Sequence, residues 1–255
     1  MKERHVAIHT PSGAMETFIV HPTEGGPFPA VVLYMDVWGI REELLDIARR
    51  IATVGYYCVL PDLYYRQGRV RTEFRDADNR MISMDRLSDA QRQIALTPLE
   101  KLTDDMVIAD TASLLEFCDR GEPARLGTTG AMGAVGYCMG GRHVFRVMEA
   151  FPRRFRACAS LHGSLIVTDD ADSPHLSALN GEGELYCGLA EKDRHAQPAK
   201  LKVLRETAWK LKFHHELHKG ADHGYALPDR DVYDKQAANR DWEIIFGMFR
   251  RQMPL

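Results

Sequence analysis

The sequence has few cysteines, no long apolar run and no low-complexity tract. Its five cysteines are an odd number without Cys-x-x-Cys spacing, which argues against a disulfide framework and a zinc cluster. No apolar run of about 20 residues occurs, so a membrane span is not expected. The N-terminus leads into a strand-like alternation instead of the apolar segment of a signal peptide. We therefore expect a cytoplasmic protein.

Charge of one sign is not concentrated anywhere along the chain. Lysine and arginine number 33 and aspartate and glutamate 36, giving a formal net charge of −3. Nucleic acid and membrane surfaces are therefore not expected as partners, and a small molecule is. The 255 residues contain no internal repeat and can bury one core. We expect one domain over residues 1–255, as a monomer or homodimer.

Apolar patterning predicts an α/β fold. A strand at 30–34, a helix at 42–54 and a strand at 56–60 form a βαβ unit, whose parallel pairing predicts a doubly wound, mostly parallel sheet flanked by helices. Two short strands, 5–9 and 15–20, predict an edge hairpin. The other expected elements are strands at 156–161, 183–190 and 213–217 and helices at 103–118, 199–212 and 233–252.

Residues 64–100 show no clear period. We expect loops and short helices over the carboxyl edge of the sheet, forming either a lid or a solvated excursion. The segment carries arginines that are candidates to meet an anionic substrate, the alternative being that they face water. These are Arg66, Arg69, Arg71 and Arg75.

The motif with the clearest chemistry is Gly-Tyr-Cys-Met-Gly at 136–140, between an apolar approach and an amphipathic pattern. It predicts a nucleophile elbow with sulfur in place of oxygen, in which Gly136 and Gly140 leave room for the turn. The helix N-terminus would favour a Cys138 thiolate, and the N–H of Met139 would supply half of an oxyanion hole. The alternative is a buried structural cysteine in a Gly-rich turn.

Two further strand ends supply partners for this sulfur. Catalytic groups gather at the carboxyl ends of the strands in a doubly wound sheet. Asp193 and His223 follow the last two strands, so the order Cys138, Asp193, His223 is that of an α/β-hydrolase triad. The histidine would act as general base and the aspartate would orient it, with Asp222 as a rival carboxylate.

These residues resemble the dienelactone hydrolase (carboxymethylenebutenolidase) family. The resemblance rests on Gly-Tyr-Cys-Met-Gly-Gly at 136–141, Gly-x-x-Glu-Lys-Asp at 188–193 and Ala-Asp-His-Gly-Tyr at 221–225, and it extends over most of the chain. It implies an α/β-hydrolase fold and hydrolysis of an ester or lactone through a thioester, carried out by the triad just named.

The resemblance also implies roles in which this chain departs from the family. A family glutamate that interacts with the nucleophile is replaced by Asp36, which is one methylene shorter, and the alternative is that Asp36 only caps its loop. Val37 would supply the second oxyanion N–H. A family arginine that grips the substrate carboxylate is replaced by Leu227, so we expect a more neutral or bulkier ester unless an arginine from 66–80 compensates. Other candidate pocket residues are Trp38, Tyr64, Tyr137 and Tyr225, the alternative being plain packing.

The expected protein is thus a cysteine-nucleophile hydrolase of a small ester or lactone that needs neither a metal nor an organic cofactor. One alternative is a catalytically relaxed scaffold of the same fold that binds a small molecule or a protein. Another is a redox role for Cys138, with Cys158 or Cys187 as a resolving thiol reached through space.

Overall fold

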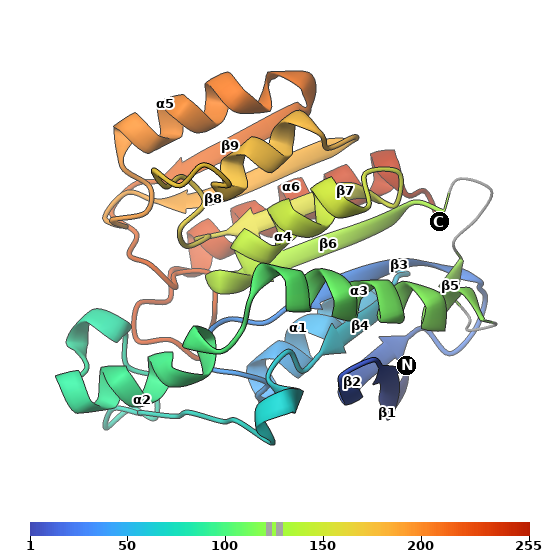
Figure 1. The fold of residues 1–255 in the computed structure, drawn as a ribbon, viewed down its shortest axis with the longest axis horizontal. Helices are drawn as coiled ribbons and strands as arrows, with labels where there is room; N and C mark the ends of the chain where they lie inside the picture. The colour runs from blue at the N-terminus through green and yellow to red at the C-terminus, as the bar shows by residue number, and fades with distance from the viewer. Residues whose placement is uncertain (121–123, 126–129) are drawn as a thin grey trace.

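A mostly parallel β-sheet runs through the computed structural model of the protein, which describes residues 1–120, 124–125 and 130–255 (Figure 1). The strand order is β1-β2-β4-β3-β6-β7-β8-β9, and β5 pairs with β3. The strands are β1 Lys2–Thr10, β2 Gly13–His21, β3 Phe28–Tyr34, β4 Tyr57–Pro61, β5 Ala124–Arg125, β6 Met132–Tyr137, β7 Phe155–Leu161, β8 Glu184–Ala190 and β9 Lys212–His218. The α-helices are α1 Glu42–Thr53, α2 Asp89–Glu100, α3 Asp104–Asp119, α4 Met139–Ala150, α5 Pro198–Thr207 and α6 Lys235–Gln252.

The pairing confirms the predicted sheet. Strands β1 and β2 form an antiparallel hairpin at one edge, and β2 pairs antiparallel with β4. From β4 across to β9 the neighbouring strands are all parallel. Because parallel strands need crossovers, helices cover both faces of this part of the sheet.

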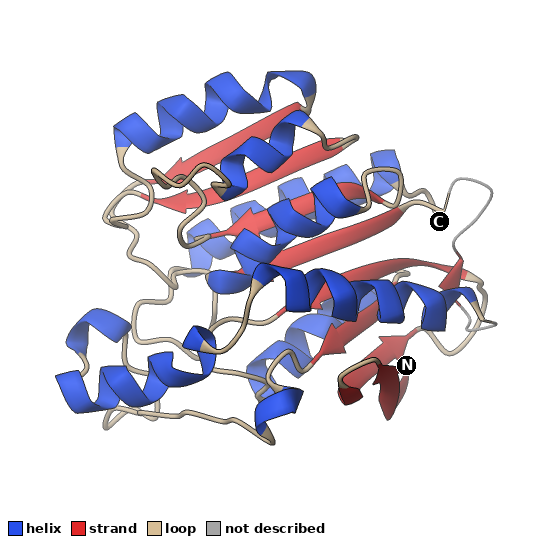
Figure 2. Ribbon diagram, in the orientation of Figure 1, coloured by secondary structure: helices blue, strands red, loops and turns tan. Residues whose placement is uncertain are grey.

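The two helical layers can be followed in Figure 2. On one face α1 packs with α6, where the Arg50 guanidinium lies 4.9 Å from the ring centre of Trp242. On the other face α3 and α4 are joined by an ion pair of 2.7 Å between Asp104 and Arg142. No helix in the described ranges combines the length and apolar character needed to cross a bilayer.

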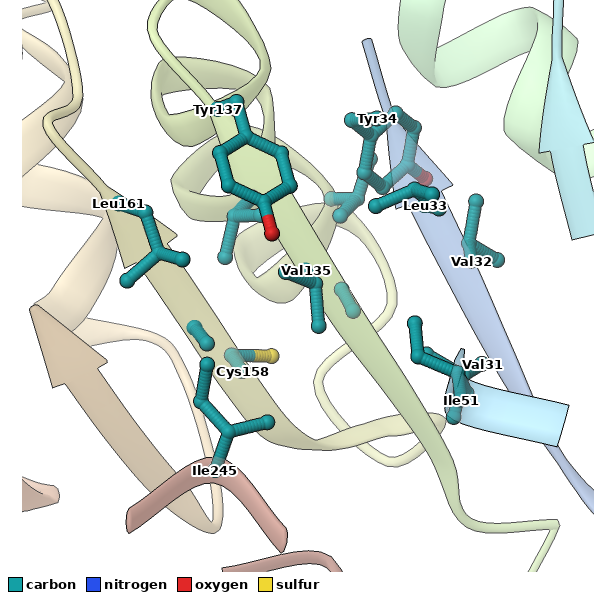
Figure 3. Close-up of a cluster of buried hydrophobic side chains, with 14 of the residues drawn as sticks. Val31, Val32, Leu33, Tyr34, Ile51, Val135, Tyr137, Cys158, Leu161 and Ile245 are labelled. Carbon is teal, nitrogen blue, oxygen red and sulfur yellow. The ribbon is translucent and has the colours of Figure 1, made fainter. Parts of the chain in front are cut away.

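The core lies on both faces of the central strands (Figure 3). Val31 of β3 and Val135 of β6 are fully buried, and Ile51 of α1 and Ile245 of α6 also belong to this cluster. A strand covered on both faces needs apolar residues at every position. This is why β3 and β6 appear in the sequence as continuous apolar runs.

Residues 64–100 contain a helix that the sequence pattern does not reveal. Helix α2 begins after Ser88, whose hydroxyl and the Gln91 side chain form a reciprocal capping box. Within α2 only Ala95 and Pro98 are buried, so the helix has almost no apolar periodicity. The sequence therefore contains the capping residues that begin this helix, but it lacks the helical spacing of apolar residues that would have predicted it.

The same segment packs on the loop that follows β3. Met81 and Leu87 form a second apolar cluster with Val37 and Trp38. The N–H of Met81 donates to Asp229 O at 2.8 Å, and the carbonyl oxygen of Met81 accepts from the N–H of Asp231 at 3.1 Å. Residues 64–100 therefore cover the carboxyl end of β3 and join it to the loop after β9.

The helix predicted at 199–212 is shorter than expected. Helix α5 ends at Thr207, a 3₁₀ turn covers Ala208–Lys210, and β9 begins at Lys212. Lys212 already pairs with Glu184 in the parallel sheet, so the chain must be extended by that point. Strand pairing therefore overrides the helical pattern of the last residues.

A buried carboxylate ties α6 to the sheet and to the loop after β9. Asp241 is fully buried and accepts three hydrogen bonds of 2.6 Å, from Tyr186, Tyr225 and His218. An Asp241→Asn variant offers one oxygen for these three donors and leaves at least one unpaired. We expect a loss of about 2–4 kcal/mol in the free energy of unfolding, measured by urea denaturation.

The matched control is Glu243→Gln on the same helix. Glu243 pairs with Arg240 at 3.3 Å on the exposed surface. Its removal is expected to change stability by less than about 0.5 kcal/mol. Equal effects from the two variants would contradict a special role for Asp241.

Candidate active site

Cys138 occupies a strained turn between β6 and α4. Its backbone angles are φ 54° and ψ −115°, in the left-handed half of conformational space that a non-glycine residue rarely adopts. The N–H of Cys138 donates to Leu161 O at 3.1 Å, which attaches the turn to the end of β7. The side chain is partly exposed at the carboxyl edge of the sheet, whereas the other four cysteines are buried.

Close backbone contacts explain the glycines on either side. A Cβ atom at Gly136 would lie 2.1 Å from the carbonyl oxygen of Gly140. A Cβ atom at Gly140 would lie 2.3 Å from the carbonyl oxygen of Tyr34, at the end of β3. Both distances are far inside van der Waals contact, so only glycine allows the turn to close against β3.

The structure brings His223 to Asp193. The Nδ1 atom of His223 lies 2.5 Å from Asp193 Oδ2, and the other carboxylate oxygen accepts the N–H of His195 at 2.8 Å. Asp193 is buried directly after β8. The rival carboxylate, Asp222, is half-buried and lies 3.7 Å from the ammonium of Lys192. Asp193 is therefore the carboxylate that orients the His223 ring.

The electrostatics of Cys138 and His223 are coupled. Burial by itself would raise the pKa of the Cys138 thiol, but the adjacent His223 charge and hydrogen bonds from His223 and Ser164 bring it below its usual value. Burial would likewise lower the pKa of His223, but the charges of Cys138 and Asp193 raise it to about 10. Both shifts act toward a thiolate beside an imidazolium, as in other activated cysteines.

The backbone N–H groups expected to form an oxyanion hole are available. Among the described residues, no hydrogen bond is donated by the N–H of Val37 or of Met139. Tyr64 joins these two segments, since its hydroxyl donates to Val37 O at 3.2 Å and contacts Met139 Sδ at 3.3 Å. Unpaired backbone donors of this kind are what a developing oxyanion needs.

Asp36 is held by an arginine on its own loop. Arg41 donates to both carboxylate oxygens, at 2.7 and 3.0 Å, and the N–H of Trp38 donates to one of them at 3.2 Å. Arg41 also binds Asp229, at 2.5 Å. In the described chain no hydrogen bond joins Asp36 to Cys138, although the Asp36 charge acts to raise the pKa of the thiol.

The predicted pocket residues lie at different depths. Trp38 packs beside the site in the second apolar cluster, and Tyr64 reaches the oxyanion segments. Tyr137, Tyr225 and Leu227 are fully buried in the main core. Figure 3 shows Tyr137 among the core side chains. Contact of these residues with a substrate stays a prediction.

Arg230 is a buried cation beside the site that sequence reasoning missed. Its guanidinium carbon lies 4.9 Å from the ring centre of Trp38 and 3.6 Å from where a Cβ of Gly224 would stand. Its Nε is buried without a hydrogen-bond partner, and none of the ion pairs in the described ranges includes it. Burial lowers the pKa of Arg230, whereas the negative charges of Asp36, Asp229 and Cys138 act to raise it. Arg230 lies in a polar turn, so no local sequence pattern marked it as a residue of the site.

The arginines of residues 64–100 that were candidates to meet an anionic substrate are either in ion pairs or exposed. Arg66 forms an ion pair with Asp110 at 2.7 Å, and Arg75 forms one with Glu73 at 2.9 Å. Arg69 and Arg71 are exposed. Arg230, from outside the 66–80 region, is instead the arginine packed between Trp38 and Gly224.

No metal is suggested by the acidic and histidine side chains. Within the described ranges, no group of three or more His, Cys, Asp or Glu residues is arranged to hold a metal ion. The redox alternative also lacks support, because Cys158 and Cys187 are fully buried and burial raises the pKa of both thiols.

Alkylation of Cys138 by iodoacetamide is expected to persist below the ordinary range of a free thiol, whose pKa is about 8.5. Because the folded-state pKa of this thiol is lowered, the thiolate is present above that pKa and is lost as pH falls through it. In His223→Ala the imidazolium is gone and burial remains, so the rate at pH 6 should fall at least about tenfold. The measurement is the rate against pH, followed by intact mass.

The four buried cysteines serve as an internal control. Burial raises the pKa of Cys58, Cys118, Cys158 and Cys187, so the native protein should take up one label. A profile for His223→Ala that superimposes on that of the wild type would rule out the ion pair.

Comparison with known proteins identifies the family of the chain. The model of the dienelactone hydrolase family matches residues 15–253. A "Putative carboxymethylenebutenolidase" of Methylorubrum extorquens is 32% identical over 172 residues, which are 66% of this chain and 52% of that protein, so the match spans about half of the relative. Another protein of that name, from Synechocystis sp., is 23% identical over 92% of this chain and 91% of its own.

Solved structures show the same fold. The crystal structure of a "Putative Dienelactone Hydrolase" from Klebsiella pneumoniae has a TM-score of 0.82 at 20% identity, and the match covers 98% of both chains. A dienelactone hydrolase-like promiscuous phosphotriesterase has a TM-score of 0.72 at 16% identity. The family model covers nearly the whole chain, and the fold extends from end to end. The chain therefore belongs to the dienelactone hydrolase family.

Proposed function

We propose that the protein hydrolyses a small carboxylic ester or lactone through a thioester on Cys138. The observation that carries this proposal is a strained, partly exposed cysteine at the sheet edge where a buried aspartate holds His223 at 2.5 Å. Lowered and raised pKa values at Cys138 and His223 support the same roles. A nucleophile whose pKa is lowered and a base whose pKa is raised, both at one edge of a sheet, are typical of nucleophilic catalysis.

In the acylation step the Cys138 thiolate attacks the carbonyl carbon. The carbonyl electron pair moves to oxygen, where the N–H groups of Val37 and Met139 stabilise the negative charge. The tetrahedral intermediate then breaks the carbon–oxygen bond of the ester, and the imidazolium of His223 gives its proton to the departing alkoxide. Asp193 keeps the ring oriented while its charge changes.

In the deacylation step the neutral His223 takes a proton from water as the water oxygen attacks the thioester carbonyl. The carbon–sulfur bond then breaks, the electron pair returns to sulfur, and the carboxylic acid leaves. The thiolate and imidazolium are thereby restored. No step requires a metal or an organic cofactor.

Cys138→Ala is expected to abolish turnover while the circular dichroism spectrum and the thermal midpoint stay close to those of the wild type. The substrates are a p-nitrophenyl ester, a neutral lactone and dienelactone, and intact mass after rapid quenching should show an acyl adduct in the wild type only. Cys158→Ala in the core is the matched control and should keep turnover. Full activity of Cys138→Ala would overturn the proposal.

The alternative function is a binding scaffold of the same fold. It predicts that the wild type binds members of the substrate panel without turnover and that Cys138 alkylates as an ordinary thiol. The unpaired N–H groups of Val37 and Met139 favour catalysis, because simple binding gives no reason to leave these two donors free.

Arg230 supports a substrate that carries an anionic group beside its ester or lactone bond. The residue lies between Trp38 and the histidine loop, and it has no ion-pair partner among the described residues. Buried charges are normally paired, so an unpaired guanidinium next to a nucleophile indicates a carboxylate supplied by the substrate. Leu227 alone favoured a more neutral or bulkier ester, whereas Arg230 favours an ester or lactone that carries an anionic group.

Arg230→Gln is expected to lower kcat/KM at least about tenfold for a lactone that bears a carboxylate, because a charged hydrogen bond is lost. Its effect on the neutral methyl ester of the same lactone should be small. Arg69→Gln, at an exposed arginine, is the matched control and should leave both values unchanged. An equal loss for the charged and the neutral substrate would contradict the assignment.

A further inference from the structure

We propose that Ser164 is a catalytic residue whose hydroxyl donates a hydrogen bond to the Cys138 thiolate, both at rest and as the thioester breaks. This inference rests on the proposed function of Cys138. Ser164 follows β7 in the loop at its carboxyl end, and none of the residues assigned above has this role.

Two contacts attach Ser164 to the elbow. Its Oγ lies 3.3 Å from Cys138 Sγ, and its N–H donates to the carbonyl oxygen of Cys138 at 3.0 Å. Either atom can donate in this contact, but once Cys138 is a thiolate its sulfur has no proton to give, and the hydroxyl of Ser164 is then the donor. The same residue therefore fixes the backbone of the nucleophile and contacts its reacting atom.

The backbone around Ser164 is strained on both sides. His162 has a φ of 37° and Leu165 a φ of 51°, although neither is glycine. The strain is held in place by a bond from the N–H of His162 to Gly188 O at 2.8 Å and by the contact of Ser164 with Cys138. Such conformations persist where the surrounding structure determines them, and they cluster at functional sites. Here they direct the Ser164 side chain toward the sulfur.

The carboxylate of Asp36 does not compete with Ser164 for the contact with Cys138 Sγ. Arg41 binds both oxygens of Asp36, and the N–H of Trp38 binds one of them. A carboxylate next to a thiolate would also repel it, whereas a hydroxyl stabilises it. In the described chain, Ser164 and His223 are the hydrogen-bonding side chains that act to lower the pKa of Cys138.

The bond matters most when sulfur carries a full negative charge. A hydrogen bond to a charged acceptor is stronger than one to a neutral thioester sulfur. As water adds to the thioester and the carbon–sulfur bond breaks, the electron pair returns to sulfur while the proton of water goes to His223. The Ser164 hydroxyl stabilises that leaving thiolate, so its removal should slow deacylation more than acylation.

The first test is the rate of Cys138 alkylation by iodoacetamide between pH 5 and 10 in the full chain. Ser164→Ala is expected to move the profile to higher pH and to lower the rate at pH 6 about tenfold. The plateau at high pH should not fall, because a less stabilised thiolate is the stronger nucleophile. Ser164→Thr keeps a hydroxyl and should restore the profile. The control is Ser113→Ala, at a half-buried serine of α3 whose hydroxyl donates to Ala109 O.

The second test is the pre-steady-state hydrolysis of a p-nitrophenyl ester. Ser164→Ala should show a burst of p-nitrophenol followed by a steady rate about tenfold lower, with acyl enzyme visible by intact mass. In the first test, an alkylation rate of Ser164→Ala that follows the wild-type pH profile, or that is lowered by the same factor at every pH, would overturn the role of Ser164. Failure of the proposed function differs, since the wild type itself would then show an ordinary thiol and no acyl enzyme.

Discussion

The rest of the site depends on one close backbone contact. Gly140 lies so near the end of β3 that a Cβ atom would stand 2.3 Å from Tyr34 O, and this contact allows Cys138 to keep a φ of 54° at the start of α4. The turn places the sulfur at the edge where β7, β8 and β9 also end. Because the neighbouring strands are parallel, their following loops meet at that edge, and each contributes one chemical group.

The site is also a set of buried charges that stabilise one another. The negative charge of Asp193 favours the imidazolium of His223, and the imidazolium favours the thiolate. Beside them Asp36 and Asp229 share Arg41. Buried charges lower the stability of a fold unless they are paired. A cluster of this kind is therefore expected at a functional site and not elsewhere in the core. Arg230 is the exception in the described chain, and a substrate anion is the partner that the proposed function gives it.

Much of the fold follows from local patterns. Continuous apolar runs predict β3, β7 and β8, because strands covered on both faces have no polar side, and the amphipathic spacing predicts α1 and α6. Two elements differ from their patterns for physical reasons. Helix α2 buries only two residues and so lacks a period, and the predicted helix at 199–212 ends early because Lys212 must pair with β8.

The sequence by itself determined the chemistry of the elbow and the order of Cys138, Asp193 and His223, because glycine spacing and residue type at strand ends are local properties. Only the tertiary structure decided which charges meet. It paired Asp36 with Arg41, brought Ser164 to the sulfur and left Arg230 beside Trp38 without an acid. Arg230 and Ser164 are separated from their neighbours by long stretches of chain, and no local pattern encodes such contacts. Side-chain partners across loops depend on how the whole sheet closes, which is a property of packing.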